Sequence, residues 1–216
     1  MSDTRGIVEN IVSLDRFRPR RKMNALRLVE GYWSALRTGG DLPKRSQVHP
    51  RALTDVLAHV FILERVAPGV ARFRVAGAQL TKLAGMEVRG MPMSAFFRTT
   101  GRHSITTALE ACFDRPAVVE ASLSARSLKL GPEVHGQMIL LPMQSDLGGV
   151  SRILGAIQMS DRLVSKAYRM TLNTCEIKSI YPNPMPRPGP RTPIAARDTR
   201  AVVRQRLELV HSADPR

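Results

Sequence analysis

Apolar and polar residues alternate on either side of a turn signal in the stretch 60–76. The apolar positions are Phe61 and Leu63 before Ala67-Pro68-Gly69, and Phe73 and Val75 after it. Alternation with a period of two around a Pro-Gly turn is typical of an antiparallel hairpin that buries one face. The pattern therefore predicts two short paired strands, with Arg72 and Arg74 on the other face.

The hydrophobic period changes after Gly77. Leu80, Leu83 and Ala84 fit one side of a two-turn helix. Gly85 is expected to end this helix in the left-handed conformation, which other residues avoid. Replacing Gly77 by valine is expected to damage folding if Gly77 has a positive φ angle.

An amphipathic helix is predicted near the N-terminus, ending at Gly39-Gly40. Its apolar positions recur at helical spacing: Leu26, Val29, Trp33 and Leu36. A face of this width buries apolar area either on a sheet or against a second copy of the same helix. The sequence leaves both interpretations open, a helix of the core and a dimer seam.

The remaining pattern completes one domain. A longer helix is expected over 102–113, and three further strands over 117–125, 134–143 and 151–160. Strands and helices in this order predict an α+β fold, with a five-stranded antiparallel sheet, helices on one face and the N-terminal helix flanking it.

Composition places the boundaries of this domain. Residues 1–22 are basic and expected to be partly disordered, 23–161 form the domain, and 162–216 form a basic C-terminal tail. Six prolines between Tyr181 and Pro193 predict an extended linker in that tail.

Several residues match a known family in order and spacing. They are Trp33, Leu42-Pro43, Arg45, Pro50, Arg74 to Gly77, Gly85 and Gly90. From Ala25 to Asp161 the chain resembles a proteobacterial family of single-domain PAS-type proteins. It departs from that family at His49, where an acidic residue is expected. The resemblance implies a PAS-like fold and a role in sensing or protein interaction.

Charge and cysteine content limit the surroundings in which the protein works. The 216 residues carry a formal net charge of +15, and many of the arginines fall in residues 16–22 and 187–206. Such clusters attract polyanions, so binding of nucleic acid or an anionic membrane through the termini is the alternative function. Two widely separated cysteines form no disulfide framework, and no apolar stretch is long enough to span a membrane. We expect a cytoplasmic protein.

No set of residues has the spacing of a catalytic or metal site. The histidines fall singly, without HxH or HExxH spacing, and no GxSxG sequence orders a catalytic serine. We therefore expect no enzymatic activity and no metal. The cofactor is unknown from the sequence. Haem would require His103 to turn inward as an axial ligand.

The PAS resemblance implies a cavity between the sheet and the helices. Methionine accommodates irregular ligands as well as it fills gaps in a core. The candidate ligand-binding residues are Arg74, Met91, Met138 and Met159. Arg74 is also expected to pair with a carboxylate on a neighbouring element. The resulting hypothesis is a sensory or interaction module that binds a signalling protein, itself or a small apolar ligand.

Overall fold

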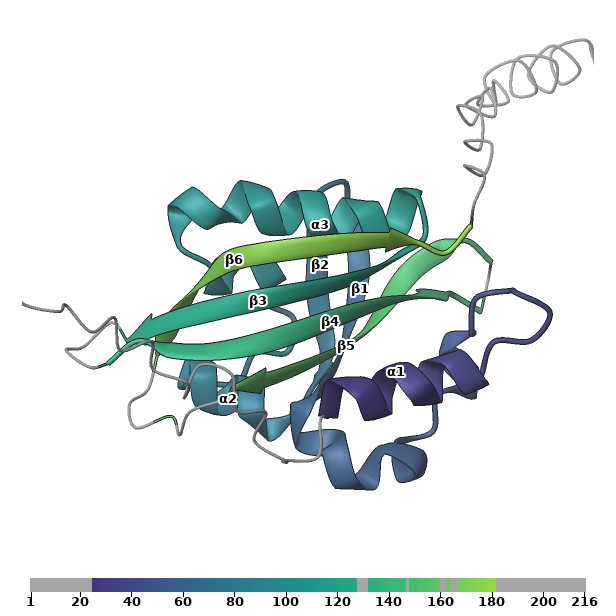
Figure 1. The fold of residues 1–216 in the computed structure, drawn as a ribbon, viewed down its shortest axis with the longest axis horizontal. Coiled ribbons are helices and arrows are strands. Elements are labelled where there is room, and N and C mark those ends of the chain that lie inside the picture. Colours follow the sequence, from purple (N-terminus) through teal and green to yellow (C-terminus); the bar gives the residue numbers. More distant parts are fainter. Residues whose placement is uncertain (1–24, 128–131, 147, 160–162, 164–166, 182–216) are drawn as a thin grey trace, which may run out of the picture. The chain divides into compact units, whose positions relative to one another are not determined.

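The computed structural model describes residues 25–127, 132–146, 148–159, 163 and 167–181. Its centre is a sheet with the strand order β2-β1-β5-β4-β3-β6, in which every neighbouring pair is antiparallel (Figure 1). The strands are β1 (Val60–Ala67), β2 (Val70–Ala76), β3 (Ala117–Ser127), β4 (Val134–Gln144), β5 (Val150–Met159) and β6 (Tyr168–Ser179). The α+β class and the antiparallel sheet are confirmed.

Helices pack on both faces of the sheet. The α-helices are α1 (Ala25–Ala35), α2 (Ala78–Ala84) and α3 (Arg102–Asp114), and the 3-10 helices are η2 (Arg45–Gln47), η3 (Pro50–His59), η4 (Met93–Phe96) and η5 (Thr99–Gly101). Successive side chains of a strand point to opposite faces. Phe61 accordingly packs with residues of α2 and α3, whereas Ile62 packs with residues of α1 and η3. We call these two sides the α3 face and the α1 face.

The sheet differs from the sequence prediction in two respects. It has six strands rather than five, and η3 joins the N-terminal helix α1 in a second layer instead of lying with the other helices on one face. The second layer arises because β1, β4 and β5 are apolar at successive positions, as in the run Met138 to Leu141. Such a run buries side chains on both faces of a sheet, so both need a cover.

The sixth strand lies inside the stretch predicted as a tail. β6 pairs with β3 along its whole length, from Ser127↔Tyr168 to Ala117↔Ser179. The predicted boundary at residue 161 therefore cuts off a strand of the sheet. Residues 1–22 and the proline-rich and arginine-rich segments beyond residue 181 lie outside the described residues.

The predicted hairpin is present, with one change of face. β1 and β2 pair around the Pro-Gly turn, and Phe61, Leu63 and Phe73 are buried as expected. The register shifts between Ile62 and Leu63, so that Val75 lies opposite Ile62 and is exposed. An extra residue in one strand turns the following side chain to the other face, which places Val75 on the α1 face.

Gly85 and Gly77 serve different purposes. Gly85 ends α2 with φ 74°, the left-handed conformation that the sequence predicts. Gly77 precedes α2 with φ −73°, so a positive φ angle is not the reason for glycine there. The backbone of η3 passes so close to Gly77 that an added Cβ would lie 2.4 Å from the Leu57 carbonyl oxygen. Glycine is needed there because of this close approach.

Helix α1 packs on the sheet as part of the core. Leu26, Val29 and Trp33 are buried, and Leu36 beyond the helix end is half-buried. The Trp33 indole donates a hydrogen bond of 2.9 Å to the carbonyl of Pro142 on β4. At the other end of α1, the Ala25 N–H donates to the Gln158 side chain at 2.9 Å. The apolar face of α1 therefore packs in the core of the chain.

Candidate functional site

Core side chains fill the α3 face, where the sequence predicts a ligand site. The rings of Phe61 and Phe96 each lie 5.6 Å from the ring of Phe73 in edge-to-face contacts. The predicted methionines in this cluster are Met138 and Met159, which are buried, and Met91, which packs against it. The structure thus brings the three methionines to one cluster, in which they pack against core residues.

Arg74, the fourth predicted ligand residue, lies away from these methionines on the α1 face. Its guanidinium pairs with the Glu64 carboxylate of the adjacent strand β1. Arg152 of β5 lies 2.7 Å from the other oxygen of the same carboxylate. The prediction that Arg74 pairs with a carboxylate on a neighbouring element is confirmed.

Neither His103 nor Cys112 has the surroundings of a reactive group. His103 is exposed in the first turn of α3, so its imidazole does not turn inward as haem ligation requires. Cys112 is buried in α3, and burial raises the pKa of its thiol. A protonated thiol is a poor nucleophile at neutral pH.

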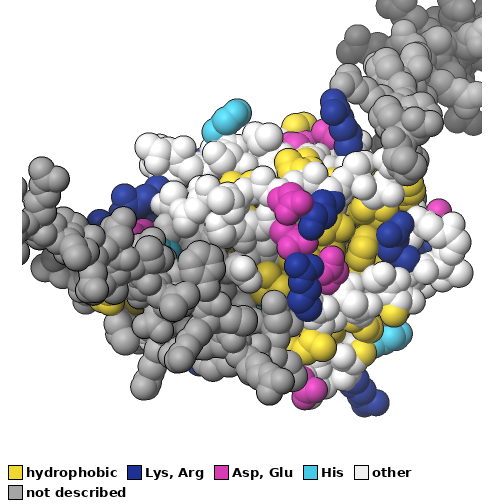
Figure 2. Space-filling view, in the orientation of Figure 1, with side chains coloured by type: hydrophobic (Ala, Val, Ile, Leu, Met, Phe, Trp, Pro, Cys, Tyr) yellow, Lys and Arg dark blue, Asp and Glu magenta, His cyan; other side chains and the backbone are white. Residues whose placement is uncertain are grey.

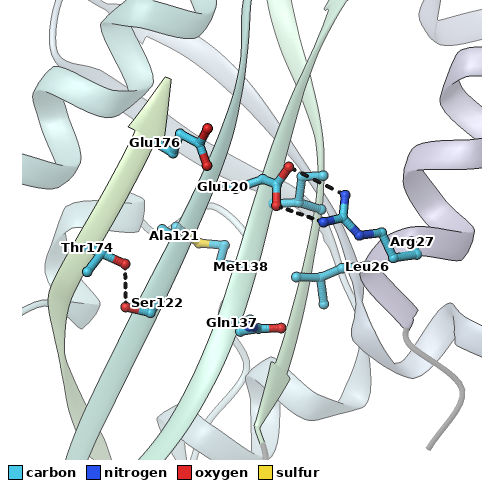
Figure 3. A pocket seen from close by; sticks show the side chains of 10 residues that line it. Leu26, Arg27, Glu120, Ala121, Ser122, Gln137, Met138, Thr174 and Glu176 are labelled. Atoms are coloured by element: carbon cyan, nitrogen blue, oxygen red, sulfur yellow. Dashed lines mark hydrogen bonds and ion pairs between the residues drawn. The ribbon is translucent and has the colours of Figure 1, made fainter. Parts of the chain in front are cut away.

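An open pocket of about 270 Å³ lies on the α1 face, between the start of α1 and strands β4, β3 and β6. Figure 3 shows Arg27 reaching from α1 toward Glu120 on β3, and Ser122 hydrogen-bonded to Thr174 of β6 at 2.6 Å. The polar side chains that line it are Arg27, Glu120, Ser122, Gln137, Thr174 and Glu176. We call these six residues and the hollow between them the α1-side pocket.

Glu120 is the electrostatic centre of the α1-side pocket. Lys178 Nζ lies 2.9 Å from one of its oxygens, and Arg27 Nη2 lies 3.2 Å from the other. The hydrogen bond from Lys178, followed by the charge of Arg27, lowers the pKa of the Glu120 carboxyl; burial opposes this shift. The same hydrogen bond raises the pKa of Lys178.

Both signs of charge therefore meet on this face. In Figure 2, acidic and basic side chains alternate at its centre, with hydrophobic side chains beside them. The apolar residues that line the pocket beside these charges are Leu26, Ala121, Met138 and Ile139. Arg27 and Lys178 are balanced by Glu120 and Glu176, so these four residues lack the net positive charge that attracts a polyanion.

Replacing Glu120 by glutamine tests these contacts. A carboxyl whose pKa is lowered by folding adds stability above its unfolded pKa and loses it as the pH falls through the folded value. The free energy of unfolding of the wild type should therefore fall more steeply below about pH 4.3 than that of Glu120→Gln. At pH 7 the variant should lose at most about 1 kcal/mol, because the pairs are partly exposed. Urea denaturation at several pH values measures the free energy of unfolding of both proteins. Equal acid dependence of the two would contradict a lowered pKa of Glu120.

Sequence reasoning missed the α1-side pocket because its residues come from distant segments. Glu120, Ser122 and Thr174 do occupy alternate positions of strands, which is a detectable signal. Their meeting depends on the pairing of β6 with β3, and the sequence prediction places that part of the chain in a tail. Without β6, Glu120 would lack its Lys178 partner.

Two other features are absent from the described residues. No group of three or more His, Cys, Asp or Glu residues there is arranged to hold a metal ion. No helix in that part of the chain is both long and apolar enough to cross a membrane.

Solved structures similar to this chain include two that are distant in sequence. The structure of an RNA-binding light-oxygen-voltage receptor aligns with a TM-score of 0.39 and 17% identity, covering 56% of this chain and 35% of that one. A light-oxygen-voltage domain studied with a flavin analogue aligns with a TM-score of 0.36 and 15% identity, covering 52% of this chain and 84% of that one. This chain thus spans about a third of the receptor's length. No curated protein matches the sequence.

The family comparison is more direct. The sequence profile of the PAS domain matches residues 21–158. This span runs from just before α1 to the end of β5, and so includes both helical layers and five of the six strands. The match covers more than half of the sequence, and the chain belongs to the PAS domain family.

Proposed function

We propose that this protein is a cytoplasmic PAS-type sensory or interaction module without a catalytic output of its own, which signals through partner binding or dimerisation. The observation that carries the proposal is the α1-side pocket. The ion pair between Arg27 and Glu120 joins α1 to the sheet at this pocket. Charges of both signs lie there beside apolar residues. A partner that binds there would contact the helix and the sheet together.

The packing of the other face favours a protein partner over a small ligand. Aromatic and methionine side chains pack between the sheet and α3, where a PAS ligand is expected. Binding an apolar ligand among Met91, Met138 and Met159 would require these side chains to move apart. Loss of such dense packing is costly, since interiors contain few voids.

Site-specific photo-crosslinking in the host cell tests the role of the α1-side pocket. A photoreactive amino acid at Gln137, which is exposed in the pocket, should give a crosslinked protein of defined mass. The same photoreactive amino acid at Thr107, which is exposed on α3, is the control and should not give this crosslink. Glu120→Lys should weaken the crosslink from position 137. Equal crosslinking from both positions, or no effect of Glu120→Lys, would contradict a partner site here.

Native mass spectrometry of the protein purified from its host separates partner binding from ligand sensing. We expect the mass of the polypeptide, alone or as an assembly. A stoichiometric extra mass of a few hundred daltons would instead favour a bound ligand on the α3 face, at the methionine cluster.

The basic termini support a second candidate function. The net charge of +15 and the arginines of residues 16–22 and 187–206 favour contact with a nucleic acid or an anionic membrane. Deleting residues 1–22 and 182–216 distinguishes the two proposals. If the function is lost while the remaining domain is folded, the termini carry it; if the partner crosslink persists, the pocket does.

A further inference from the structure

Strand β6 is an addition to the part of the chain that matches the PAS profile. The match ends at residue 158, and β6 begins at Tyr168. It forms one outer edge of the sheet, with β3 as its neighbour. Near its start the outer edge is closed, because Arg98 donates its N–H to the Met170 carbonyl at 3.0 Å. From Thr171 onward no strand of the described part of the chain pairs with this edge. An edge of this kind is a template for another strand.

The hydrogen bonds of β6 define which backbone groups face outward. In an antiparallel strand the N–H and C=O of one residue point to one edge, and those of the next residue point to the other. Ile180 donates its N–H to the Pro116 carbonyl, so its backbone faces β3. By alternation, the residues whose backbones face β3 are Thr174, Glu176 and Lys178, and those whose backbones face outward are Cys175, Ile177 and Ser179.

The side chains of this segment are arranged symmetrically about Ile177. Glu176 and Lys178 flank it and lie on the α1 face, where Lys178 contacts Glu120. Both are exposed, with 67% and 49% of their side chains accessible. Ile177 lies on the opposite face, on which it is one of the exposed large apolar residues.

We propose that two copies of this chain pair through β6, antiparallel about a two-fold axis at Ile177. Ile177 then lies opposite its symmetry mate, a pair in which both backbones face outward and exchange hydrogen bonds. Glu176 lies opposite Lys178 of the second copy, and Lys178 opposite its Glu176. These two are non-hydrogen-bonded pairs, in which the side chains are closest. The two sheets become continuous across the axis.

Charge repulsion also disfavours two neighbouring registers of the β6 pair. An axis at residue 176 would place Glu176 opposite Glu176, and an axis at residue 178 would place Lys178 opposite Lys178. Like charges directly opposite one another destabilise a strand pair. The pairing is closed by the two-fold axis, since each copy uses its β6 edge once, and no further copy can add there.

This inference deepens the proposed function. The pairing through β6 follows from the strand itself, whereas the role of the dimer in signalling rests on the proposed function. The two fail differently. A monomeric protein that still gives the crosslink from position 137 would overturn the β6 pairing and leave the partner site standing. A β6 dimer without that crosslink would overturn the partner site alone.

The mass of the full chain in solution tests the pairing, measured by light scattering or sedimentation over a range of concentrations. We expect a dimer for the wild type. Glu176→Lys places lysine opposite lysine twice and should weaken the dimer by roughly 10- to 100-fold. It should leave the fold intact, since position 176 lies opposite Glu120 on β3. The double variant Glu176→Lys/Lys178→Glu restores opposite charges in the same register and should recover the dimer.

Two further variants complete the test. Asp55→Lys makes the same charge change at an exposed position of η3 and should leave the dimer unchanged. Ile177→Pro removes an N–H that faces away from β3, so the monomer should fold while the dimer is lost. Thermal unfolding of each variant verifies the fold. A wild-type monomer, a dimer indifferent to Glu176→Lys and Ile177→Pro, or a charge reversal that does not recover the dimer would each overturn the proposal.

Discussion

Replacing Trp33 by alanine is expected to lower the free energy of unfolding by about 3–5 kcal/mol, the range for removing a large aromatic side chain from a core. Only 3% of Trp33 is exposed, and it packs in the layer between α1 and the sheet. Its indole N–H also satisfies the buried Pro142 carbonyl, which alanine would leave without this donor. The packing loss and the unpaired carbonyl add in the same direction.

Leu28 provides the matched control in the same helix. It is 44% exposed on the solvent side of α1, so Leu28→Ala should change stability by less than about 0.5 kcal/mol. Urea denaturation monitored by circular dichroism gives both values. A loss below about 1 kcal/mol for Trp33→Ala would contradict burial of α1 on the sheet.

Gly77→Ala is expected to lower the free energy of unfolding by about 3 kcal/mol, although its backbone angles suit any residue. The added Cβ would lie 2.4 Å from the Leu57 oxygen and 2.5 Å from the Ala58 oxygen. Both are backbone atoms of η3, which a rotamer change cannot move aside. The variant must separate η3 from the start of α2.

Gly31 is the control for this substitution. It lies within α1, and nothing is within 4 Å of the position of an added Cβ. Gly31→Ala should therefore stabilise the protein by roughly 0.5–1 kcal/mol, because alanine is the better helix residue. Equal melting temperatures for Gly77→Ala and the wild type would show that η3 does not approach Gly77 in solution.

Local patterns predicted the elements that have a strong period and a clear turn residue. The hairpin around Pro68-Gly69 and the end of α2 at Gly85 are confirmed, as is the helix that became α3. Each depends on residues that are neighbours in sequence. The change of hydrophobic period after Gly77 coincides with the start of α2, but the close contact of Gly77 with η3 is a tertiary feature that no local pattern contains.

The strand β6 escaped prediction for a physical reason. Its first half alternates through Tyr168, Met170 and Leu172, but Asn173 is an extra residue that shifts the register. From there to Ser179 the strand is exposed, so its sequence shows no buried face. The candidate site depends on this strand, and so the meeting of Glu120 with Lys178 could not be deduced from the sequence alone.

The hydrogen bond from Trp33 to Pro142 makes α1 a structural substitute for a strand. The pairing of β4 with β3 ends at Leu140, and proline at position 142 has no N–H to extend a ladder. At this end of β4 the indole of α1 provides the donor that a neighbouring strand would otherwise offer. Any signal that moved α1 away from the sheet would thus remove the hydrogen-bond donor from the end of a central strand. The separation of α1 from the sheet and the opening of this end of β4 should therefore occur together.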